Sequence, residues 1–95
     1  MPKWVIVVKR RGRKENFDER KIYASIYSAC MSRYLNEPKC ESIAAGITNV
    51  IKRWLNNKNV ITSNQIRKKV RTELGKKGRD LVYHYDANIP DLSRL

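Results

Sequence analysis

The clearest hydrophobic pattern in the chain runs from residue 40 to residue 55. Its apolar side chains recur at the spacing that gathers them on one face of an α-helix: Cys40, Ile43, Ala44, Ile47, Val50, Ile51, Trp54 and Leu55. Asn36 to Lys39 interrupts the pattern before it, and Pro38 suits the first turn of a helix. We therefore expect a core helix here, with Gly46 marking a close helix crossing.

A second helical pattern precedes it, from Asp18 to about Met31. Asp18 suits the N-cap position of this helix because its carboxylate can accept a backbone N–H of the first turn. The inward residues are Ile22, Ile26 and Ala29, with Tyr23, Tyr27 and Tyr34 beside them. We expect these tyrosines at the edge of the core.

Two further helices are predicted in the second half of the chain. Thr62 and Gln65 have the spacing of a capping box, which opens a helix that we expect to end near Gly75. The stretch from Arg79 to Ala87 predicts a last short helix. The inward residues of these two helices are Ile66, Val70, Leu74, Leu81, Val82 and Tyr85.

The N-terminal segment has the composition of a β-hairpin. Trp4 to Val8 is a β-branched and aromatic run, Arg11 and Gly12 form a two-residue turn signal, and the chain from Arg13 to Phe17 can return as a second strand. This turn sets Val8 opposite Glu15, Val7 opposite Asn16 and Ile6 opposite Phe17. It also sets cation opposite cation, Lys9 with Lys14 and Arg10 with Arg13.

Like charges directly opposite each other destabilise a hairpin, so a bound anion would relieve a cost that the free protein carries. A solvated basic hairpin without a ligand is the alternative. The pattern as a whole predicts an α+β fold, in which the hairpin and a short third strand at Val60 and Ile61 pack on a bundle of about four helices. We expect one domain over residues 1–88 and a loose tail over 89–95.

Composition limits the functions open to this domain. The chain has 95 residues and a net charge of +12, and its cations gather before Lys21 and between Arg67 and Arg79. Such a surface attracts polyanions, whether nucleotide phosphates, nucleic acid or acidic proteins. No apolar run approaches the roughly 20 residues that span a bilayer, which predicts a cytoplasmic protein without membrane contact.

Motifs for metal binding and catalysis are missing from the sequence. Cys30, Cys40 and His84 are the only cysteines and histidine, too few to supply a structural zinc site. The sequence does not exclude a disulfide between Cys30 and Cys40, but the place of Cys40 on an apolar face favours free thiols. The sequence contains neither a phosphate-binding glycine loop of known type nor a nucleophile motif. We expect no metal site and no enzyme activity.

The hairpin is also where the chain resembles a known family. The string Val-x-Lys-Arg-x-Gly, then a Glu and Phe-Asp-x-x-Lys-Ile, resembles the start of the ATP-cone, an adenine-nucleotide-binding regulatory domain found at the N-terminus of ribonucleotide reductases. The matching residues are Val7 or Val8, Lys9, Arg10, Gly12, Glu15, Phe17, Asp18, Lys21 and Ile22. The segment from Ile61 to Ile66, with Val70 and Leu74, resembles the later strand and helix of the family, so that the similarity spans about residues 5 to 85.

This resemblance implies a ligand, ATP or dATP, held between the hairpin and the helices. It implies that Val7 contacts the base and that Glu15 accepts a hydrogen bond from the adenine amino group. The implied phosphate contacts are Lys9, Arg10, Lys21 and Arg67, with Asp18 and Ser63 beside the ligand. The implied role is regulation of a partner in trans, such as a ribonucleotide reductase.

The chain departs from the family pattern at two places. Arg11 stands before the turn glycine, where the family commonly has an acidic residue or Asn, and this adds a cation. The last helix, from Leu81 to Tyr85, lacks the small residue and the spaced aromatic and basic residues of the family. We therefore expect one phosphate contact to be missing.

Two other functions fit the composition. The first is a nucleic-acid-binding module, which would be nucleotide-gated if both ligands bind. Its basic face would comprise Arg67, Lys68, Lys69, Arg71, Lys76, Lys77 and Arg79. The second is a protein-interaction adaptor or homo-oligomer that uses Trp4 or the tyrosines.

Overall fold

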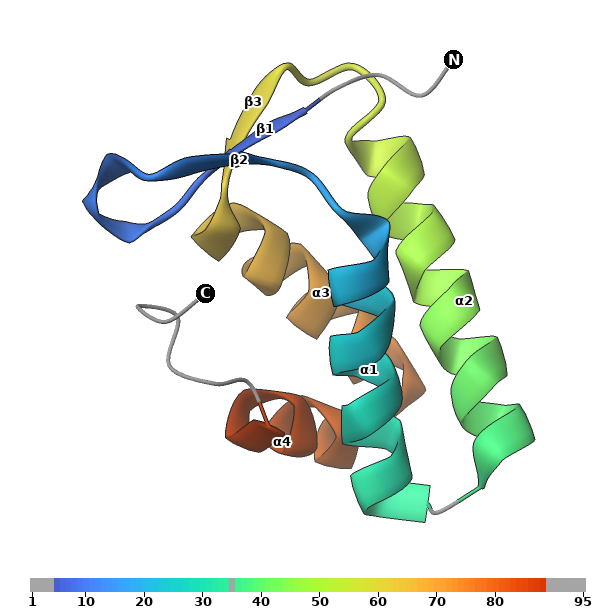
Figure 1. Cartoon of the computed structure of the whole chain (residues 1–95). Helices are drawn as coiled ribbons and strands as arrows, with labels where there is room; N and C mark the ends of the chain where they lie inside the picture. The colour runs from blue at the N-terminus through green and yellow to red at the C-terminus, as the bar shows by residue number, and fades with distance from the viewer. Residues whose placement is uncertain (1–4, 35, 89–95) are drawn as a thin grey trace.

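The longest amphipathic pattern forms the longest helix, α2 (Glu37–Trp54), in a computed structural model that describes residues 5–34 and 36–88 (Figure 1). Asn36 is its N-cap, since the side-chain oxygen of Asn36 accepts the backbone N–H of Lys39 at 3.0 Å. Pro38 lies in the first turn, as expected. Gly46 is exposed, and a Cβ atom there would meet nothing within 4 Å, so the expected close helix crossing at this residue is wrong.

The other helices are α1 (Glu19–Tyr34), α3 (Ser63–Lys77) and α4 (Arg79–Asn88). Helix α1 packs against both α2 and α4, and α3 packs against α4 and α2. The core between them is formed by the apolar faces that the sequence predicted, and its largest fully buried side chains are Ile26, Ile51, Leu74, Leu81, Val70, Cys30 and Cys40. Tyr23, Tyr27 and Tyr34 are partly buried against this core, as expected.

Both cysteines are buried free thiols. Burial raises the pKa of Cys30 to about 12, so its thiol stays protonated at neutral pH. This agrees with the interpretation of Cys40 as a small apolar residue of the core.

The start of α3 matches the sequence prediction, but its end does not. Its start is a capping box, in which Thr62 Oγ1 accepts the backbone N–H of Gln65 at 3.1 Å and the Gln65 side chain accepts the N–H of Thr62 at 3.0 Å. The expected stop at Gly75 is wrong, because the helix continues to Lys77. Lys76 Nζ lies 3.0 Å from Glu73 Oε2 and stabilises this last turn. The helix then ends with a hydrogen bond from the backbone N–H of Gly78 to the carbonyl of Leu74.

A small sheet lies across one end of the helices (Figure 1). Its strand order is β2-β1-β3, where β1 (Ile6–Val8) pairs antiparallel with β2 (Lys14–Asn16) and parallel with β3 (Val60–Thr62). The α+β class, the hairpin and the third strand are thereby confirmed. The described residues do not include Trp4 or the tail at 89–95. The outer limits of the predicted domain therefore also fall outside them.

The hairpin register differs by one residue from the expected one. Val7, rather than Val8, lies opposite Glu15, and Val8 lies opposite Lys14. The loop is longer than two residues, because the N–H of Lys9 donates to the carbonyl of Arg13 at 2.7 Å around a turn at Arg10–Gly12. The predicted facing pairs, Lys9 with Lys14 and Arg10 with Arg13, are therefore wrong.

The core dictates the observed register. Val5 and Val7 are buried, and Phe17 packs against the same core, so the chain must place these three side chains on one face of the hairpin. Side chains alternate between the two faces of a strand, and a slip of one residue would have turned Phe17 away from that face. The N–H of Phe17 accordingly donates to the carbonyl of Val5 at 2.8 Å.

Candidate functional site

The face of the sheet that looks onto the helices changes from apolar to charged along its length. Val7 pairs with Glu15 on one side and with Ile61 on the other, so these three side chains share the inner face. Val7 and Ile61 are buried. Lys9, two residues after Val7, continues the same face, and only 9% of its side chain is exposed.

Two lysines converge on one carboxylate oxygen at this place. Glu15 Oε1 lies 2.8 Å from Lys9 Nζ and 3.1 Å from Lys21 Nζ. Lys21 comes from the first turns of α1, so the three side chains connect the hairpin with that helix. The Lys9 hydrogen bond, reinforced by Lys21, holds the pKa of Glu15 below its usual 4.5 against the opposing effect of partial burial.

This arrangement predicts a defined dependence of stability on pH. A carboxyl whose pKa is lower in the folded state stabilises the fold above its unfolded pKa, and this stabilisation is lost as the pH falls through the folded pKa. We therefore expect Glu15→Gln to lower the unfolding free energy at pH 7. The difference from the wild type should shrink as the pH falls below 4.5.

Urea unfolding at several pH values measures this effect. The control is Glu41→Gln, because Glu41 is exposed and forms no ion pair with any other described residue. A Glu15→Gln variant as stable as the wild type at pH 7 would contradict the role assigned to the lysine pair.

Helix α3 brings two more of the predicted residues to the same region. The parallel register sets Val8 beside Thr62, so the next residues, Lys9 and Ser63, follow at the same end of the two strands. Arg67 lies one helical turn beyond Ser63. Arg67 Nη2 lies 3.5 Å from Asp86 Oδ1 in α4, and Arg71 Nε lies 3.2 Å from the same oxygen.

Tyr85 connects α3 with α1. Burial raises the pKa of Tyr85 to about 12, an effect that Arg67 and the hydroxyl of Ser25 partly oppose. Tyr85 is therefore near both Arg67 of α3 and Ser25 of α1, and Ser25 lies one turn after Lys21. Helix α4 packs against both α1 and α3, and Figure 1 shows the hairpin and α4 extending to the same side of α1.

Sequence reasoning did not identify the contacts that α4 makes with α1 and α3. Tyr85 was expected only as a core residue, and Asp86 had no assigned role. Asp86 Oδ1 is buried and forms no well-aligned hydrogen bond within the described part of the chain, although two arginines lie near it. The signal in the sequence was the pair Tyr85-Asp86 in a segment rich in aromatic residues, which by itself does not reveal its partners on α3.

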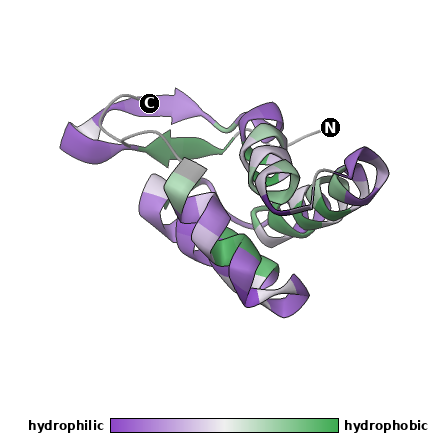
Figure 2. Cartoon of the chain, turned by 90° about the horizontal axis from the view of Figure 1, so that it is seen from below, coloured by the Kyte–Doolittle hydropathy of each residue, from purple (hydrophilic) through white to green (hydrophobic). Residues whose placement is uncertain are grey.

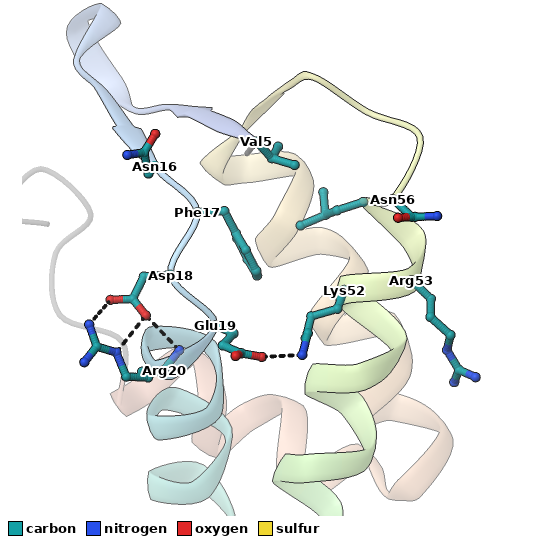
Figure 3. Close-up of a pocket in the computed structure, with 10 residues that line it drawn as sticks. Val5, Asn16, Phe17, Asp18, Glu19, Arg20, Lys52, Arg53 and Asn56 are labelled. Atoms are coloured by element: carbon teal, nitrogen blue, oxygen red, sulfur yellow. Dashed lines mark hydrogen bonds and ion pairs between the residues drawn. The ribbon is translucent and has the colours of Figure 1, made fainter. Parts of the chain in front are cut away.

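Two predicted residues take no part in the ion pairs at Glu15 and Asp86. Arg10 is exposed in the hairpin loop and forms no ion pair with a described residue. Asp18 caps α1 as expected, because its Oδ1 accepts the N–H of Arg20 at 3.0 Å. The Arg20 guanidinium also contacts both carboxylate oxygens, and this hydrogen bonding lowers the pKa of Asp18 (Figure 3).

A separate open hollow of about 980 Å³ lies between the start of α1 and the end of α2 (Figure 3). Val5, Phe17 and Leu55 form its apolar part, and a Glu19–Lys52 ion pair of 2.7 Å joins its two sides. Of the predicted binding residues, Asp18 alone lines it. The hollow therefore does not coincide with the residues that converge on Glu15.

The described residues contain no group of three or more His, Cys, Asp or Glu side chains suited to hold a metal ion. Over the same part of the chain, no helix combines the length and the apolar character needed to cross a membrane.

A search among curated proteins found no similar sequence. A family model described as the ATP cone domain matches residues 5–85. This match takes in the sheet, helices α1 to α3 and most of α4, and the chain therefore belongs to the ATP-cone family.

Proposed function

We propose that this protein is a regulatory domain that binds ATP or dATP and senses the nucleotide for a partner in trans. Membership of the ATP-cone family supports adenine nucleotide binding with a regulatory role. The observation that carries the proposal is the convergence of Lys9 and Lys21 on Glu15, between the hairpin and α1.

The phosphates would be held by cations that carboxylates now neutralise. Lys21 is 58% exposed at its side chain, so its ammonium group can leave Glu15 and follow a phosphate. Arg67 is only loosely held by Asp86, because Arg67 Nη2 lies 3.5 Å from Asp86 Oδ1. A guanidinium binds phosphate oxygens through the same paired N–H groups with which it binds carboxylates. Lys9 is the most buried of these cations, and shielding from water strengthens its attraction for a phosphate.

The base would lie against the inner face of the sheet. Both lysines contact Oε1 of Glu15, at 2.8 and 3.1 Å. An ionised carboxylate has about four acceptor positions, so Oε2 can accept from the adenine amino group while Oε1 holds a lysine. Val7, directly across the strand pair from Glu15, would supply apolar contact at the edge of the base.

The remaining family positions would act at the margins of the site. Arg10 would reach the phosphates from the exposed loop, and Ser63 would contact them from the start of α3. Asp18 would act chiefly by fixing the start of α1, and with it Lys21. We propose no catalytic role for any of these residues, because their cations suit holding phosphates rather than activating water.

Ligand choice tests this function. We expect ATP and dATP to bind at least about tenfold more tightly than GTP, because guanine presents a carbonyl where adenine presents the amino group to Glu15, leaving a buried acceptor unpaired. Isothermal titration calorimetry with the three nucleotides measures the difference, and the nucleotide should be recovered without hydrolysis.

Melting curves provide a second measurement on the same protein. A ligand selective for the folded state raises the melting temperature with its concentration, so ATP should do so more than GTP. Equal affinity for GTP would disprove the adenine assignment, and no response to millimolar ATP would disprove the function itself.

A further inference from the structure

The tip of the hairpin, defined here as Arg10, Arg11, Arg13 and Lys14, is the least neutralised basic surface of the described chain. All four side chains are exposed, and none forms an ion pair with another described residue. The tip extends away from the helices in Figure 1 and is coloured hydrophilic in Figure 2. Four cations within five residues therefore remain available to an anionic partner.

The basic face of α3 is different, although its sequence is equally rich in cations. Lys69 and Lys76 both pair with Glu73, at 3.6 and 3.0 Å. Arg67 and Arg71 share Asp86. Of the cations that the sequence placed on this face, those without an ion pair to a described residue are Lys68, Lys77 and Arg79. Carboxylates therefore neutralise this face more fully than the hairpin tip.

The backbone of the tip carries strain at an arginine. Arg11 has φ 67° and ψ 21°, the left-handed conformation, and the following Gly12 has φ 75°. The side chain of a residue other than glycine crowds the backbone in this region, and such positions concentrate at functional sites. The conformation would be less costly with glycine or asparagine at position 11, so an arginine there favours a function for its charge.

We propose that the hairpin tip binds the phosphate backbone of duplex DNA. From Arg10 to Lys14 the tip has no apolar side chain, so it lacks the buried anchor that a protein interface needs and the apolar wedge that a membrane surface needs. A two-stranded ribbon fits the major groove of B-form DNA, whereas the major groove of duplex RNA is deep and narrow. Arginine forks pair well with phosphate oxygens.

Two triple variants with equal charge loss test this proposal. The tip variant is Arg11→Gly, Arg13→Gln and Lys14→Gln, which keeps Arg10 and relieves the strain at position 11. The control variant is Lys68→Gln, Lys77→Gln and Arg79→Gln. Fluorescence anisotropy with a labelled duplex of about 20 base pairs, at several salt concentrations, gives the affinity and its salt dependence.

We expect wild-type binding in the micromolar range at low salt. The tip variant should bind at least about tenfold more weakly, with a salt slope smaller by about 0.9 for each phosphate contact removed. The control variant should lose clearly less. Equal losses in both variants would mean attraction by net charge alone, and stronger binding to duplex RNA or to an acidic peptide than to DNA would also overturn the proposal.

This inference does not depend on the nucleotide site, with which the tip shares Arg10 alone. The tip variant keeps Arg10 together with Lys9, Glu15, Lys21 and Arg67, so its ATP affinity by calorimetry should match the wild type. Loss of DNA binding with ATP binding retained would support the tip as a second site. DNA binding retained in the tip variant would refute it, whatever the result with ATP.

Discussion

Replacing Lys9 with Met is expected to weaken ATP binding by about 10- to 100-fold, the loss typical of a hydrogen bond to a charged group. Lys9 is the most enclosed cation of the site, with 9% of its side chain exposed, so water cannot substitute for its contact with a phosphate. Methionine keeps a long apolar stem against the inner face of the sheet while it removes the charge. Isothermal titration calorimetry measures the affinity of each variant.

The matched control is Lys68→Met, because Lys68 is exposed on α3 and forms no ion pair with a described residue. It removes the same charge and should leave ATP affinity within about twofold of the wild type, since exposed distant charges are screened by salt. Circular dichroism should show that both variants remain folded. Equal losses in the two variants would mean that overall charge, not the site at Glu15, attracts the nucleotide.

The largest effect on stability is expected for Leu74→Ala. Leu74 is fully buried in α3, and truncation of such a side chain costs about 2–5 kcal/mol through lost burial and the cavity left behind. In a domain of this size that corresponds to a fall in melting temperature of at least about 10 °C. Thermal and urea unfolding measure the change, and ATP should partly restore the melting temperature of the variant.

Val60→Thr serves as its control. Val60 is 61% exposed, and threonine keeps the branched side chain that suits a strand. Its melting temperature should stay close to the wild-type value. A Leu74→Ala variant that melts like this control would contradict the core position of Leu74.

The helices could be predicted because their signals are local. The spacing of apolar residues identified the buried face of α2, and Asn36 and Thr62 marked helix starts through contacts that span only three residues. The end of α3 was predicted wrongly at Gly75, because a glycine can remain inside a helix when neighbouring residues stabilise the helical turn. The Lys76–Glu73 ion pair does so here.

The hairpin register could not be read from the turn residues alone. Arg11-Gly12 is a good two-residue turn signal, but the burial of Val5 and Val7, with Phe17 packed against the same core, determined the register instead. That constraint comes from helices far away in the sequence, so no local pattern contains it.

The part of the candidate site near the hairpin could be predicted, because its residues lie close together in the sequence. The resemblance pointed to Lys9, Glu15 and Lys21, which the fold brings together. Tyr85 and Asp86 are separated from the hairpin by most of the chain, and only the packing of α4 on α1 and α3 reveals their contacts.

The parallel pairing of β1 with β3 also bears on the order in which the fold can assemble. The two strands are separated by more than fifty residues, while β1 and β2 are neighbours in the chain. During synthesis the hairpin can close early, but β1 remains an open edge until Val60–Thr62 has been made. Because β3 runs directly into α3, closing that edge also brings the start of α3, with Ser63, to the hairpin, so the sheet and the proposed binding site would be completed in the same late step.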